Sequence, residues 1–136
     1  MSTDFEPAND LERTLVAAQQ GRLPVASFMD KLIASQVLVL FDREPVADGK
    51  RDESAIPMIL TNQAGQPVLA VFTAPERASD WSRREPRFQT GLLTDFAWLL
   101  RGISPQLGVV VNPGLKEGLE MPASGVAQLK ARAQRQ

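Results

Sequence analysis

The sequence PVLAVFTAPER at residues 67–77 joins an apolar strand directly to the start of a helix. Another apolar run, at residues 37–41, is short, continuous and β-branched, which is typical of a strand buried on both faces. Thr73 and Glu76 have the spacing of a capping box, and Pro75 suits the first helical turn. A buried strand at residues 109–111 ends at an Asn-Pro-Gly turn. Helical patterns separate this strand from the one before Thr73, so we predict that the two run parallel in one sheet.

Other elements follow from the spacing of apolar residues on both sides of this stretch. Asn9 and Glu12 predict a capped helix that ends near Gly21. The spacing of Val25, Phe28, Met29, Leu32 and Ile33 predicts a second helix with these side chains inward. Further strands are expected at residues 37–41 and in a hairpin of 56–61 with 67–72, and further helices at 75–85, 92–103 and 124–133.

These elements predict a single α/β domain, of mixed α+β type, over residues 1–136. We expect one mixed sheet of four to five strands, including the hairpin, flanked by about five helices. Residues 1–8 are expected to be a disordered tail. The charged loop at residues 43–55 should be less ordered than the strands beside it, because no apolar pattern anchors it.

The composition excludes several classes of function. The 136 residues include 15 Lys and Arg against 16 Asp and Glu, a net charge of −1. This balance argues against binding to nucleic acid or to an anionic membrane. Cysteine and histidine are both absent, which excludes disulfides, thiol catalysis, thiolate metal sites and the commonest general base. The longest apolar runs have five residues, too few to cross a bilayer.

Motifs for catalysis, metal binding or phosphate binding find little support in the sequence. The serines lie in neither a G-x-S-x-G elbow nor an S-x-x-K arrangement. Acidic residues at 42–53 lack the spacing of a calcium loop and alternate with cations. The strand-to-helix turn at residues 73–75 has no glycine that could cradle a phosphate. We therefore predict no catalytic residue, no metal and no cofactor.

The candidate site lies at the carboxyl ends of the two parallel strands, outside which open α/β sheets bind their ligands. Adjacent strands lie about 4.8 Å apart, so Thr73 and Asn112 should lie within about 12 Å of each other. We nominate both as binding residues, together with Glu76, Arg77 and Trp81 on the helix that follows. The alternative is that Thr73 and Glu76 only cap that helix and Asn112 only makes a turn.

Trp98 is a further candidate binding residue. On the wheel of the helix expected at residues 92–103, it falls about 155° from the centre of the apolar stripe. Either the opening helix pair covers this tryptophan, or it is exposed and belongs to an interface with a partner or a second copy.

A set of residues spread over nearly the whole chain resembles the N-terminal domain of the SseB family, the bacterial enhanced-serine-sensitivity proteins. The matching residues are Asn9, Leu11, Glu12, Leu15, Phe28, Leu32, Ser35, Val37, Val71–Thr73, Glu76, Arg77, Trp81, Val111–Gly114, Gly118, Glu120 and Pro122. Longer members carry a second, C-terminal domain, so the resemblance implies a standalone N-terminal domain. The family has no established enzymatic reaction, so the resemblance implies a fold and no catalytic mechanism.

We therefore expect a non-enzymatic, cytoplasmic binding module. Its partner is expected to be a protein or a second copy of the chain, with a small ligand as the other candidate. One alternative is an enzyme that uses only carboxylate, arginine and lysine side chains, which a perturbed Asp or Glu in a deep polar pocket would favour. A second alternative is a secretion-associated accessory protein. A shallow apolar groove would favour the binding module.

Overall fold

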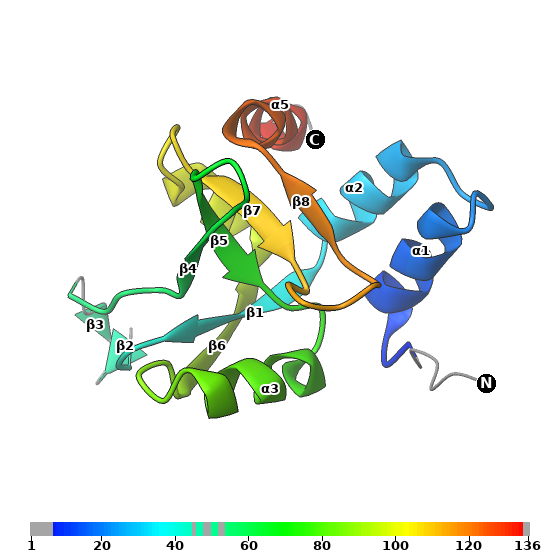
Figure 1. Ribbon diagram of the computed structural model, residues 1–136. Helices are drawn as coiled ribbons and strands as arrows, with labels where there is room; N and C mark the ends of the chain where they lie inside the picture. Colours follow the sequence, from blue (N-terminus) through cyan, green and yellow to red (C-terminus); the bar gives the residue numbers. More distant parts are fainter. Residues whose placement is uncertain (1–6, 45, 48–49, 52–53, 135–136) are drawn as a thin grey trace.

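A computed structural model describes residues 7–44, 46–47, 50–51 and 54–134 of the chain. Two helices open the described part of the chain, five strands follow, and the remaining helices and strands are interspersed (Figure 1). In order, they are α1 (Asp10–Gln19), α2 (Val25–Ile33), β1 (Gln36–Phe41), β2 (Val46–Ala47), β3 (Lys50–Arg51), β4 (Ile59–Thr61), β5 (Pro67–Val71), α3 (Pro75–Arg84), β6 (Thr90–Asp95), α4 (Phe96–Gly102), β7 (Gly108–Val111), β8 (Leu119–Met121) and α5 (Ala123–Gln134).

The central sheet has four strands in the order β4-β5-β7-β8. β5 and β7 are parallel, while β4 and β8 run antiparallel to their neighbours, so the sheet is mixed as predicted. β1 and β6 form a separate antiparallel ribbon, and β2 pairs with β3. The ribbon meets β5 where Leu38 and Phe72 exchange two backbone hydrogen bonds of 2.9 Å. The strands of the predicted single sheet are therefore divided between two main sheets.

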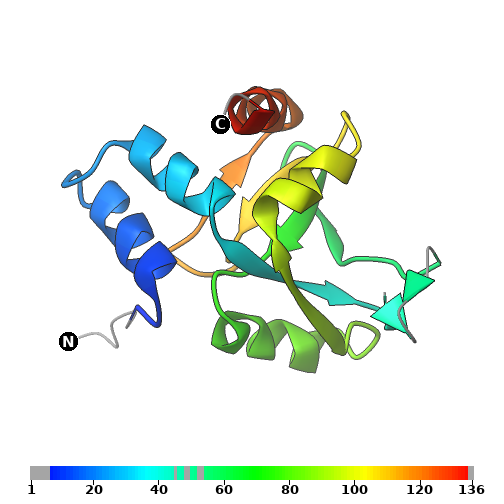
Figure 2. The ribbon, with the colours of Figure 1, turned by 180° about the vertical axis from the view of Figure 1, so that it is seen from behind.

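Helices cover both sides of the strands (Figures 1 and 2). α3 lies on one side, and α5 lies on the opposite side with α2 and α4 nearby. β5 contributes Leu69 and Val71 to the larger core, which includes residues of α1, α2, α4 and α5. Ala70 on the same strand and Phe72 just beyond it join a smaller core with Ala78 of α3. The strand predicted at residues 37–41 to be buried on both faces is confirmed, because Val37 and Val39 of β1 join the larger core and Leu38 and Leu40 join the smaller one.

The helix predicted over residues 92–103 is wrong in its first part. Leu92 and Leu93 lie in β6, where they pair with Val39 and Leu38, and exposure alternates along the strand. α4 begins only at Phe96. Two adjacent leucines fit a helical stripe and a strand equally well, and the pairing of six consecutive residues with β1 favours the strand.

The short strand β8 was not predicted, and it adds an antiparallel edge beside β7. Two further expectations concern the charged loop and the tail. Within the charged loop, residues 45, 48–49 and 52–53 lie outside the described residues, so the expected disorder stays a prediction. Of the expected tail at residues 1–8, only residues 7 and 8 are described, and Ala8 is tied to α1 by a hydrogen bond from its backbone N–H to Glu12.

Candidate functional site

The carboxyl ends of β5 and β7 meet at one edge of the central sheet, as predicted. The Thr73 backbone N–H donates to Asn112 Oδ1 over 3.0 Å, and Asn112 Nδ2 donates to Thr73 Oγ1 over 2.9 Å. Asn112 Nδ2 also donates to the Glu117 carbonyl over 3.0 Å. Asn112 has a φ of 52°, a left-handed conformation that asparagine tolerates better than most residues. The predicted proximity of Thr73 and Asn112 is confirmed.

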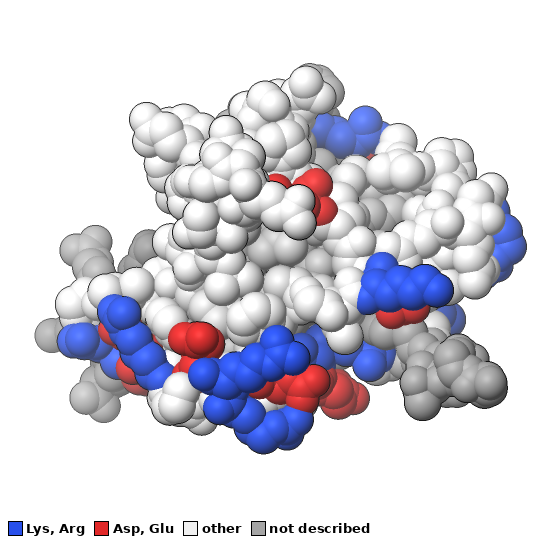
Figure 3. All heavy atoms as spheres, in the orientation of Figure 1, with Lys and Arg blue, Asp and Glu red and all other residues white. Residues whose placement is uncertain are grey.

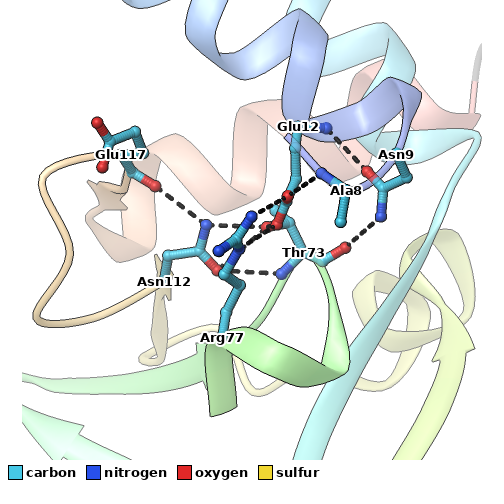
Figure 4. Close-up of polar contacts among 7 residues, drawn as sticks. All are labelled: Ala8, Asn9, Glu12, Thr73, Arg77, Asn112 and Glu117. Carbon is cyan, nitrogen blue, oxygen red and sulfur yellow. Dashed lines mark hydrogen bonds and ion pairs between the residues drawn. The ribbon is translucent and has the colours of Figure 1, made fainter. Parts of the chain in front are cut away.

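Glu12 reaches this edge from the first turn of α1 (Figure 4). Its carboxylate is completely buried and accepts from Thr73 Oγ1 over 2.5 Å and from the Ala8 N–H over 2.7 Å. Asn9, the N-cap of α1, adds a bond of 2.9 Å from its Nδ2 to the Thr73 carbonyl. Glu12 therefore ties the start of α1 to the carboxyl end of β5.

Arg77, from the first turns of α3, completes the cluster. Its Nη2 lies 2.7 Å from Glu12 Oε1, and its Nε lies 2.8 Å from Glu12 Oε2, so the two side chains form a bidentate ion pair. Burial alone would raise the pKa of Glu12, but the bonds from Arg77, Thr73 and Ala8 outweigh it and hold the pKa below its ordinary value. We call Glu12, Thr73, Arg77 and Asn112 the edge cluster.

The edge cluster changes the interpretation of Thr73 and Glu76. The N-cap of α3 is Ala74, and no side chain caps this helix, so the predicted capping box of Thr73 and Glu76 is wrong. The Thr73 hydroxyl donates to Glu12 instead, because that bond satisfies a buried carboxylate. Glu76 is exposed on α3 and is not part of the edge cluster.

Trp81 lies beside the turn that follows β7. Its Nε1 donates to the Pro113 carbonyl over 2.7 Å. A Cβ atom at Gly114 would lie 3.6 Å from the indole ring, so Trp81 packs closely over this turn. Arg84 stacks on the Trp81 ring, with its Cζ 5.3 Å from the ring centroid. These contacts join α3 to the turn that carries Asn112.

A groove of about 550 Å³ lies between α2 and α5, away from the edge cluster. Mostly apolar side chains line it: Val25, Ala26, Met29, Met121, Gly125, Gln128, Leu129, Ala131 and Arg132. Val25 is 57% exposed, although the sequence pattern placed it inward with Phe28. Arg132 of α5 binds Asp30 of α2 through two hydrogen bonds, of 2.5 and 2.9 Å. We call this feature the α2–α5 groove.

The sequence matches one known protein family. The sequence model of the family described as SseB protein N-terminal domain matches residues 11–128. The chain belongs to this family. No curated protein and no solved structure matches it. The match to the SseB domain includes all four residues of the edge cluster. It also includes most of the groove lining, whereas Leu129, Ala131 and Arg132 lie just beyond it.

The polar atoms of this SseB domain are largely satisfied by one another. Among the described residues, every buried side-chain nitrogen and oxygen has a hydrogen-bond partner. Within that same part of the chain, no three acidic residues lie close enough together to hold a metal ion, and no helix is long and apolar enough to cross a membrane. The edge cluster thus joins α1, α3 and the two parallel strands, and it directs no unpaired buried group toward a ligand.

Sequence reasoning missed Glu12 and the groove. Apart from its place in the family resemblance, Glu12 was interpreted as part of a capping box, and its partners Thr73 and Arg77 are more than 60 positions away. No local sequence signal links Glu12 to these two residues. Val25 was assigned to the core because it fits a helical stripe, whereas it is exposed and lines the groove. Met29 packs against the larger core as expected and also lines the groove.

Trp98 is 39% exposed on α4, between the buried residues Phe96 and Leu100. The opening helix pair therefore does not cover it completely, and its role in an interface stays a prediction. We expect Trp98→Ala to lower the free energy of unfolding by about 1–2 kcal/mol, because only part of the ring is buried. Phe96→Ala, at a fully buried position of the same helix, should lower it by about 3–5 kcal/mol. Urea titration of both variants would show this order, and equal losses would contradict it.

Proposed function

We propose that this SseB domain is a non-catalytic, cytoplasmic module that binds a protein partner in the α2–α5 groove. The observation that carries the proposal is the groove itself, an apolar hollow between two helices with a half-exposed wall at Val25. Contiguous exposed apolar surface is typical of sites that bind another protein. Its lining includes two methionines, whose flexible side chains adapt to a partner's surface.

The edge cluster supports a binding role over an enzymatic one. A carboxylate tuned for acid–base catalysis at neutral pH needs a raised pKa. Glu12 has the opposite shift, and its two oxygens already accept four hydrogen bonds. The ligand position at the ends of β5 and β7 is thus filled by the chain's own side chains.

Charge on the surface agrees with this choice of site. Figure 3 shows charged side chains gathered over α3, while few lie on the surface between α5 and the strands. On α3, Arg83 pairs with Asp80, and nearby Arg87 lies 3.8 Å from Asp42. The α3 surface therefore presents ion pairs rather than the contiguous apolar surface on which the proposal rests.

A blocking variant is needed to test the groove, and Gly125 of α5 provides it. A Cβ atom at Gly125 would lie 3.5 Å from its nearest neighbour, which is ordinary contact. We expect Gly125→Leu to fill the groove and to leave the free energy of unfolding unchanged or raised by about 0.5 kcal/mol. At Gly118, by contrast, a Cβ would lie 2.4 Å from the Val111 carbonyl oxygen, so Gly118→Ala should lower stability by about 1–3 kcal/mol. Thermal melts of both variants check this, and a destabilised Gly125→Leu would contradict it.

Site-specific photo-crosslinking in intact cells tests the proposed function. A photo-reactive phenylalanine analogue replaces Ala26 in the groove wall or, as the control, Ser79 on the opposite side of the domain. We expect a discrete crosslinked protein from the first position, none of the same size from the second, and loss of the product when Gly125→Leu is added. Equal products from both positions, or a product that survives Gly125→Leu, would refute a partner site in the groove.

A further inference from the structure

The walls and lining of the α2–α5 groove indicate the secondary structure and the charge of the partner segment that it binds. This inference rests on the proposed function. Both walls are helices, α2 of nine residues and α5 of twelve. At 1.5 Å per residue, the shorter wall extends about 13 Å, or two to three helical turns. A groove between two helices is suited to a third helix, whose side-chain ridge packs between theirs.

The lining of the groove favours close approach of such a helix. Ala26 on one wall and Gly125 with Ala131 on the other have little or no side chain. Met29, Met121 and Leu129 provide the apolar surface between them. Residues spaced at i, i+3, i+4 and i+7 would lie along one side of the partner helix and bury their apolar side chains there.

The charge of the groove indicates a second property of the partner helix, which is an acidic side chain. Of the residues that line the groove, Arg132 is the one that carries a charge. Its bidentate bond to Asp30 uses two of the five N–H donors of a guanidinium. The Arg132 side chain is 38% exposed, so its other N–H groups can donate to a second carboxylate from outside.

We propose that the occupant of the α2–α5 groove is an amphipathic helix of a partner protein, with an apolar ridge and an Asp or Glu that binds Arg132. The apolar ridge supplies the contact area, and the carboxylate fixes the direction and register of the helix. A basic helix is disfavoured, because the charge that lines the groove is positive.

Selection from a display library of helical peptides of about 15 residues tests this proposal. The wild-type domain is the target, and Gly125→Leu is the counter-target that removes peptides bound elsewhere. We expect the enriched peptides to share apolar residues at i, i+3 or i+4, and i+7, with an acidic residue about one turn beyond. Enriched peptides that are extended, proline-rich or basic would overturn the proposal.

Two variants test the carboxylate contact, measured by fluorescence polarisation with one selected peptide. Arg132→Gln should weaken binding about tenfold, because it removes the cation. Asp30→Asn also breaks the ion pair but leaves Arg132 in place, so it should not weaken binding. Equal weakening by both variants would show that the pair only shapes the groove and would overturn the carboxylate contact.

The crosslinking and peptide experiments together distinguish failure of the helix proposal from failure of the proposed function. If Ala26 crosslinks a partner but no selected peptide depends on the groove, the helix is refuted and the partner site stands. If the crosslinks are also absent, both fall. Self-association that depends on concentration and is lost in Gly125→Leu would assign the groove to a second copy and would overturn the proposal.

Discussion

Replacing Arg77 with methionine should destabilise the domain by about 3–5 kcal/mol at pH 7, because it leaves the Glu12 carboxylate buried without its cation. Arg83→Met is the matched control, with the same substitution on the same helix. Arg83 is exposed and pairs with Asp80 at the surface, so its loss should cost about 1 kcal/mol or less. Urea denaturation of both variants measures the difference. Equal effects would show that the buried pair contributes nothing beyond a surface pair.

The pH dependence of stability should change sign in Arg77→Met. In the wild type, the pKa of Glu12 is lowered, so its contribution is present above the unfolded value near 4.5 and is lost as the pH falls further. Without Arg77, burial should raise the pKa of Glu12 above that value. The folded variant would then bind the proton more tightly than the unfolded chain, and its stability should rise as the pH falls from 7 to 5. A flat profile over this interval would contradict the assignment.

Glu12→Gln separates the charge of the pair from its hydrogen bonds. The amide keeps an acceptor for Thr73 or Ala8, and Arg77 is partly exposed and can turn to water. We expect a smaller loss than in Arg77→Met, about 2 kcal/mol. The double variant should lose less than the sum of the two single losses, because the charges are removed together. Additive losses would show that Glu12 and Arg77 stabilise the domain independently.

Asn112→Ala should destabilise the domain by about 3 kcal/mol, the second large effect. The substitution leaves the Thr73 N–H without its acceptor and the Glu117 carbonyl without its donor, and the former is buried. Alanine also fits the left-handed backbone at this position less well than asparagine.

Asn112→Gly separates these two contributions. Glycine loses the same hydrogen bonds but adopts positive φ without strain. We expect Asn112→Gly to be more stable than Asn112→Ala by about 1 kcal/mol and still less stable than the wild type. If glycine restored wild-type stability, the hydrogen bonds between the two strand ends would be energetically unimportant.

Much of the fold was predictable because its signals are local. The strand that enters Thr73 and the strand that ends at Asn112 each show a continuous apolar run, and turn residues mark the hairpin of β4 with β5. β6 was not predicted correctly, because Leu92 and Leu93 fit both a helical and a strand period. Its assignment depends on pairing with β1, about 50 residues earlier in the chain.

The candidate site was predictable only in part. Parallel topology places Thr73 beside Asn112 whatever their side chains do, so their proximity could be inferred from the order of elements. Glu12 could not be, since its local capping role hides a contact with Arg77 across 65 positions. The groove depends on how α2 and α5 are placed, and the apolar spacing of α2 does not distinguish an inward Val25 from an exposed one.

The most direct test of the binding site uses the methionine methyl groups as NMR probes. Met29 and Met121 line the α2–α5 groove, whereas Met58 lies in the smaller core beside α3. Methyl-labelled domain would be added to a soluble extract of the cells that naturally make it. We predict chemical-shift changes at Met29 and Met121, none at Met58, and none in Gly125→Leu relative to its own free spectrum. Unchanged Met29 and Met121 signals, or equal changes in the Gly125→Leu variant, would contradict a partner site in the groove.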